Sequence, residues 1–91
     1  MSKSLNTKFS TSQTVVATTA TPIVAERSGR DTVVIENHGT TNVFLGNSGV
    51  TTSTGLLLPG VVGASVAIET TEAIYGIVGT GTQAVSSIEN F

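Results

Sequence analysis

The residues best suited to chemistry lie together in the segment VVIENHGTTNVFLG, residues 33 to 46. It contains Glu36, Asn37 and His38, the only histidine of the chain. With Asp31 and one serine, His38 could form a Ser-His-Asp arrangement for nucleophilic catalysis. However, no serine lies in a G-x-S-x-G sequence, which marks a nucleophile at a strand-to-helix turn. We therefore interpret the segment as a turn, with Glu36 at the solvent-side end of a strand, His38 solvated at the tip, and Asn37 and Gly39 supplying an unusual backbone. No catalytic residue is expected.

Carboxylates offer a second kind of chemistry, because a pair of them can hydrolyse a glycosidic bond. All six lie at expected strand ends or turns: Glu26, Asp31, Glu36, Glu69, Glu72 and Glu89. The closest pair, Glu69 and Glu72, flanks two threonines. A solvated polar turn is the favoured interpretation, because paired carboxylates need a cleft that a small β-sandwich seldom provides.

Metal and phosphate sites find little support in the sequence. One histidine and no cysteine exclude a zinc site built by a single chain. A ring of His38 or of a carboxylate on a three-fold axis could hold an ion. The glycines at 76, 79 and 81 are spaced in the wrong order for a dinucleotide fingerprint and precede an expected strand. We expect no metal and no cofactor.

The composition favours β-structure and a surface with few charges. Only 11% of the residues are charged, against about a quarter in ordinary soluble domains. Sixteen threonines and twelve valines favour pleated sheet over helix. A chain of 91 residues without cysteine has a small core and no disulfides, so association of subunits is the remaining inexpensive source of stability.

Short alternating segments separated by turn residues predict seven or eight strands. The expected fold is all-β: a small antiparallel β-sandwich or jelly-roll-like barrel, with an extended N-terminal arm. Residues 1–12 show no sustained period and are assigned to this polar arm, and residues 13–91 to a single β-sandwich domain. Segments 31–36 and 42–45 are interpreted as an antiparallel hairpin. The other expected strands lie within residues 13–25, 56–58, 64–69, 73–78 and 82–88.

Several of these strands carry apolar residues on both faces. A two-layer sandwich covers only one face of each sheet. Four apolar side chains should therefore point outward: Val34, Phe44, Tyr75 and Ile77. The preferred cover for them is a subunit interface.

Charge and hydropathy exclude two classes of partner. The net charge is −2, and the four basic residues form no stripe, so no nucleic acid is expected: Lys3, Lys8, Arg27 and Arg30. No apolar run approaches the roughly 18 residues of a spanning helix, so no membrane partner is expected. The N-terminus lacks the apolar segment of a secretory signal, which predicts a soluble, unsecreted protein.

Residues 30–60, RDTVVIENHGTTNVFLGNSGVTTSTGLLLPG, resemble small structural proteins of tailed-bacteriophage virions. The shared pattern is an arginine that opens a strand ending in Ile-x-Asn, a glycine turn, a return strand ending in Leu-Gly, then Val-Thr, a glycine and Leu-x-Pro-Gly. Here it comprises Arg30, Ile35, Asn37, Gly39, Val43, Leu45-Gly46, Val50-Thr51, Gly55 and Leu58-Pro59-Gly60. With similar flanks, the resemblance covers about residues 13–89.

The resemblance is strongest to capsid decoration, or cement, proteins. It implies a trimer on the outer capsid surface, made in the host cytoplasm, that binds the major capsid protein and stabilises the shell. The expected contacts with capsid or subunits are Lys3, Leu5, Lys8, Phe9, Val34, Phe44, Tyr75 and Ile77. An alternative is a head or tail fibre, or tail-tip, module that recognises a host-surface glycan. A small hydrolase ranks last.

Overall fold

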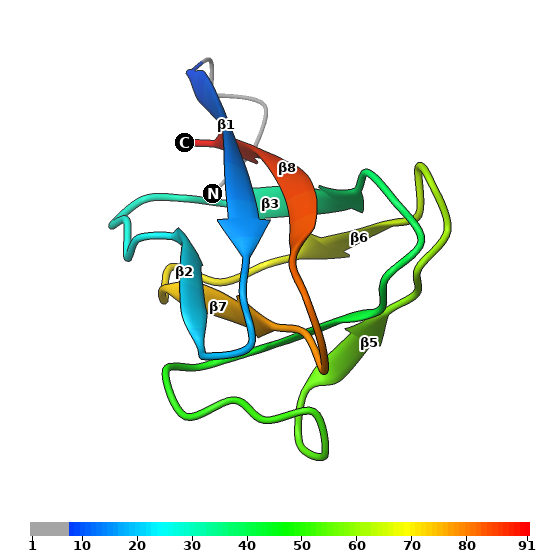
Figure 1. Cartoon of the computed structure of the whole chain (residues 1–91). Coiled ribbons are helices and arrows are strands. Elements are labelled where there is room, and N and C mark those ends of the chain that lie inside the picture. The colour runs from blue at the N-terminus through cyan, green and yellow to red at the C-terminus, as the bar shows by residue number, and fades with distance from the viewer. Residues whose placement is uncertain (1–7) are drawn as a thin grey trace.

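The computed structural model describes residues 8–91, which form eight β-strands in this part of the chain. In Figure 1, β1 lies beside β8, and β2 lies beside β7. Their bounds are β1 Phe9–Val16, β2 Thr21–Val24, β3 Thr32–Asn37, β4 Val43–Gly46, β5 Leu56–Leu58, β6 Ser65–Ile68, β7 Ile74–Ile77 and β8 Gln83–Asn90. Lys3 and Leu5 lie outside the described residues.

The strands build two four-stranded antiparallel sheets. Sheet A has the order β1-β8-β3-β6, and sheet B the order β2-β7-β4-β5. The chain behaves as one long hairpin that turns at β4–β5, since β1 pairs with β8, β2 with β7, β3 with β6 and β4 with β5. Rolling this hairpin up adds the β3–β8 and β4–β7 pairings. This strand order is that of a jelly roll, which confirms the all-β sandwich fold.

The core lies between the sheets and consists of the apolar residues that alternate along each strand. Val33 and Ile35 of β3 are fully buried and face Val43 and Leu45 of β4. The remaining buried members are Val16, Ile23, Val24, Leu58, Ile74, Val78 and Val85. The predicted inward positions on β6, Val66 and Ile68, are partly buried against this cluster. Alternation therefore predicted the inner face correctly.

The predicted hairpin between residues 31–36 and 42–45 is wrong. β3 lies in sheet A and β4 in sheet B, so the turn between them crosses from one layer to the other. Both strands have an apolar face that must be buried in the core. Two strands in opposite sheets can bury these faces in the same core. Strand pairing with distant partners then supplies the hydrogen bonds, through β6 and β8 for β3 and through β5 and β7 for β4.

The predicted arm, residues 1–12, requires a correction. Residues 9–12 are the first half of β1, which pairs with β8 at every position from Phe9 to Val16. This edge strand needs no apolar period, because its backbone hydrogen bonds to β8 hold it while most of its side chains remain exposed. Residues 9–12 are therefore part of sheet A, and residues 1–7 of the predicted arm lie outside the described residues.

Two glycines in the β7–β8 region test how tightly the core side chains of sheet B pack over β7. A Cβ on Gly76 would lie 2.8 Å from Ile23 Cδ1 and 3.2 Å from Val43 Cγ1, inside the core. We expect Gly76→Ala to lower the free energy of unfolding by about 1–2 kcal/mol through overpacking. A Cβ on Gly79 would meet no atom within 4 Å, so Gly79→Ala should stay within about 0.5 kcal/mol. Urea unfolding of both variants measures the difference, and equal effects would contradict this view of the core.

Candidate interaction surfaces

Asp31 and His38, which were considered above for a Ser-His-Asp arrangement, do not come together. Asp31 precedes β3 and His38 follows it, so the length of a six-residue strand, about 20 Å, separates them. The Ser-His-Asp arrangement with Asp31 is therefore excluded by the fold. His38 nevertheless has a partner, because its Nε2 lies 2.8 Å from Ser86 Oγ on β8. His38 is exposed, as expected for a solvated turn histidine.

Asn37 is not a solvated turn residue but the centre of a buried hydrogen-bond cluster. Its side chain is fully buried at the end of β3, where the chain leaves sheet A. Its Nδ2 donates to the carbonyls of Thr41 (2.9 Å) and Pro59 (3.1 Å), and its Oδ1 accepts from the N–H of Gly39 (2.9 Å). Among the described residues, positive φ occurs only at Gly29, Gly63 and Gly81, so Asn37 and Gly39 do not supply the expected backbone.

Arg30 closes the opposite end of the sandwich. Its guanidinium is fully buried and pairs with Glu89 Oε1 on β8 at 3.0 Å. It also donates to the carbonyls of Ala25 (3.0 Å), Thr70 (2.8 Å) and Glu72. These carbonyls belong to the two connections that cross between the sheets at this end, β2–β3 and β6–β7. Arg30 is thus a structural residue rather than part of a basic surface.

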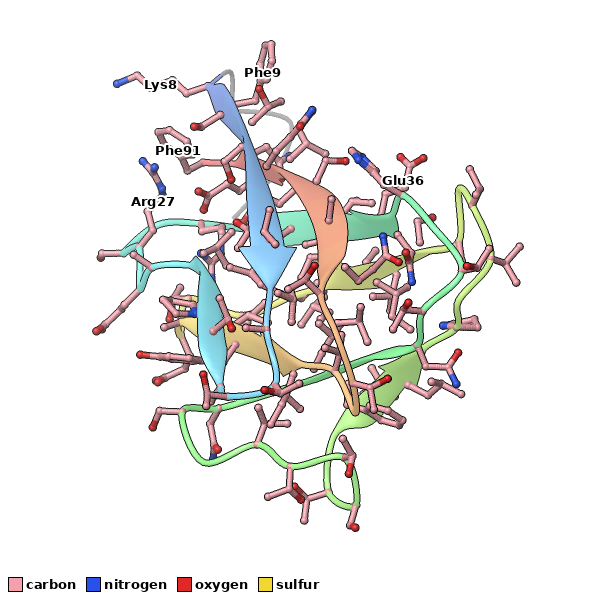
Figure 2. The ribbon with its side chains drawn as sticks, viewed as in Figure 1. Lys8, Phe9, Arg27, Glu36 and Phe91 are labelled. Carbon is pink, nitrogen blue, oxygen red and sulfur yellow. The ribbon has the colours of Figure 1, made fainter. Side chains whose placement is uncertain are left out.

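The outer face of sheet A carries two adjoining hollows. One, of about 310 Å³, is lined by hydroxyl and amide side chains of β1 and β8 together with Glu36. The other, of about 360 Å³, is lined at the far end of the face by Phe9, Thr32 and Asn90. Val34 and Ile88 line both hollows. Figure 2 shows Lys8 and Phe9 projecting at the start of β1, and Glu36 at the end of β3.

The outer face of sheet B is apolar. The register places Phe44 opposite Ile77 and Leu57, and places Tyr75 opposite Pro22. Leu57 is 48% exposed, whereas the side chains of Phe44, Tyr75 and Ile77 are partly buried. We call this continuous row the sheet B patch: Pro22, Phe44, Leu57, Tyr75 and Ile77.

The predicted outward residues therefore divide between opposite sides of the molecule. Phe44, Tyr75 and Ile77 share the sheet B patch, whereas Val34 lies on the outer face of sheet A with Phe9. Lys8 is exposed just before β1, and its backbone pairs with that of Phe91. Sequence reasoning missed Ile88 and Leu57, which are 43% and 48% exposed. Alternation along the last strand could have indicated Ile88, but the LLL run carries no period that distinguishes Leu57.

Neither protein-family models, curated proteins nor solved structures match this chain. Within residues 8–91, no three acidic or histidine side chains lie close enough to hold a metal ion. The same residues form no helix long and apolar enough to cross a membrane.

Proposed function

We propose that this protein is a capsid decoration protein of a tailed bacteriophage. It binds the major capsid protein on the outer capsid surface as an oligomer, for which the resemblance implies a trimer. Each bound copy stabilises the assembled shell, because a ligand that binds only the assembled state shifts the equilibrium toward it.

The observation that carries the proposal is that apolar side chains reach the surface on both outer faces of one small domain, on opposite sides of it. A cement protein has to hold two neighbours at once, and a single domain can do so only with two separate contact surfaces. The sheet B patch offers one, and the outer face of sheet A, with Phe9, Val34 and Ile88, offers the other. Large exposed apolar patches on soluble domains mark interaction sites.

A charge placed on the sheet B patch tests the proposal. Leu57→Asp introduces a carboxylate at the rim of this patch, and we expect at least a ten-fold loss of binding to purified, expanded capsids, measured by co-sedimentation. Ser53→Asp is the matched control, because Ser53 lies in the exposed loop before β5 and off the patch. Unchanged binding by a folded Leu57→Asp protein would contradict the role of the patch, and no saturable capsid binding by the native protein would overturn the proposal.

A second candidate function is recognition of a host-surface glycan. The hollow of about 310 Å³ favours it, because Thr11, Gln13 and Ser86 offer hydroxyl and amide groups beside the Glu36 carboxylate. Such groups can bond to sugar hydroxyls. Saturable binding to intact host cells, lost in Gln13→Ala and accompanied by no binding to capsids, would favour this function over decoration.

A further inference from the structure

We propose that β1 is a self-pairing edge, through which two copies of this chain join their A sheets antiparallel across a two-fold axis. The occupant of the edge is therefore the β1 strand of a second copy. This inference goes beyond the proposed function: it does not depend on capsid binding, and it makes the oligomer a two-fold dimer in place of the trimer that the resemblance implies.

The first argument is that β1 lacks the features that normally protect a sheet edge. Edge strands are usually short, bulged, or interrupted by proline or charge. β2 has four residues, Pro22 and a register shift, and β5 has three residues followed by Pro59. β6, the other edge of sheet A, has four residues. By contrast, β1 is eight residues long, regular, and free of charge and proline within its bounds.

The second argument comes from the backbone. Lys8 N–H donates to the carbonyl of Phe91 (3.2 Å), and Phe91 N–H donates to the carbonyl of Lys8 (2.9 Å). Because such doubly bonded pairs alternate along an antiparallel ladder, the even-numbered residues of β1 bond to β8. The odd-numbered ones, Phe9, Thr11, Gln13 and Val15, direct their N–H and C=O groups to the other side. Within the described chain, β8 is the one strand that pairs with β1, so these groups face an open edge.

The third argument is that the side chains of β1 are self-complementary about Ser12. In an antiparallel pair centred on this residue, Phe9 lies opposite Val15 of the second copy, and Thr11 lies opposite Gln13. Phe9 and Val15 are 67% and 61% exposed, and each would cover the other. A cross-strand pair of an aromatic and a β-branched residue is favourable. The four odd-numbered residues are the hydrogen-bonded positions in this register, so side chains and backbone select the same pairing.

Single cysteines test this register directly, because the chain has none of its own. Ser12 would be a non-hydrogen-bonded pair with its own copy, with Cα atoms about 4.5 Å apart, which a disulfide can span. We expect Ser12→Cys to form a covalent dimer under mild oxidation. Ser10→Cys is the matched control, since it lies on the same face and its two copies would be about 14 Å apart. Equal cross-linking of both variants, or none, would overturn the inference.

Charges at the edge give an independent test in solution. Thr11→Lys with Gln13→Lys opposes like charges in the dimer, and we expect about ten-fold weaker dimerisation by sedimentation equilibrium. Thr11→Lys with Gln13→Glu opposes unlike charges at the same positions and should retain the dimer. Both variants should fold, because these side chains are exposed. Thermal unfolding checks that they do.

Other outcomes are decisive as well. A native protein that is monomeric at high concentration, or a stable trimer without cross-linking at residue 12, would overturn the inference. A monomer that dimerises only after deletion of residues 1–7 would also overturn it, since that segment would then cover the edge. A dimer that fails to bind capsids leaves the inference intact and contradicts only the proposed function.

Discussion

Arg30→Ala is expected to lower the free energy of unfolding by about 3–5 kcal/mol, as measured by urea unfolding. Removing one partner of a buried ion pair leaves the other charge uncompensated, which costs about this much. Here Glu89 would lose its buried partner at 3.0 Å and keep only the partly exposed Arg27, and three backbone carbonyls would lose their donor. Such a loss is a large share of the roughly 5–15 kcal/mol that stabilises a typical domain.

The neighbouring arginine provides the control for this prediction. Arg27 Nε approaches the same Glu89 oxygen at 3.3 Å, and its guanidinium carbon lies 3.8 Å from the centre of the Phe91 ring (Figure 2). Its side chain is 38% exposed, so solvent screens the pair, and Arg27→Ala should cost about 1 kcal/mol or less. Equal losses for the two arginines would show that burial of Arg30 does not hold this end of the sandwich together.

A double variant separates the ion pair from the carbonyl contacts. Arg30→Met with Glu89→Leu removes both charges, and replacing a whole buried pair is often nearly neutral. The carbonyls of Ala25, Thr70 and Glu72 would still lack a donor. We therefore expect the double variant to be more stable than Arg30→Met alone but less stable than the native protein. Full recovery would mean that the carbonyl contacts contribute little.

Asn37→Ala is expected to cost about 2–4 kcal/mol at the other end of the sandwich. The change leaves the Gly39 N–H and the carbonyls of Thr41 and Pro59 without their partner, and an unsatisfied buried group costs about 1–3 kcal/mol. Asn37→Asp keeps the acceptor but replaces both donors with a buried charge, so we expect at least the same loss. Chemical unfolding of both variants measures it.

Asn47 is the matched control. Its Oδ1 accepts from the N–H of Gly49 at 2.9 Å, the same contact that Asn37 makes with Gly39. This second contact is exposed, so water replaces the lost partner, and Asn47→Ala should cost about 0.5 kcal/mol or less. If the two alanine variants were equally destabilised, burial of the Asn37 cluster would not be the cause.

The alternation of apolar and polar residues along the sequence predicts most of the strands. The alternation in DTVVIE and NVFL indicated the inner positions Val33, Ile35, Val43 and Leu45, and all four are buried. Alternation reports which side of a strand is apolar, and this property depends only on neighbouring residues. Proline cannot donate a hydrogen bond to a neighbouring strand, so Pro22 favours an edge position, and β2 lies at the edge of sheet B.

Patterns that depend on distant partners were less informative. The first half of β1 is rich in hydroxyl side chains and shows no apolar period, which predicts an arm. Its hydrogen bonds come from β8, more than 60 residues away in the sequence. The roles of Arg30 and Asn37 were missed for the same reason. Most of their acceptors are backbone carbonyls of other connections, and any residue type can supply a carbonyl.

The residue pattern alone predicts the all-β fold, the inner face of most strands and the presence of outward apolar residues. These follow from side-chain chemistry and a period of two. Only the folded chain places β3 and β4 in different sheets, which puts Val34 and Phe44 on opposite sides of the molecule. The apolar faces of β3 and β4 can reach the same core in two ways, because the two strands can be neighbours in one sheet or can lie in opposite sheets. Only the rolled arrangement of the whole chain selects between them.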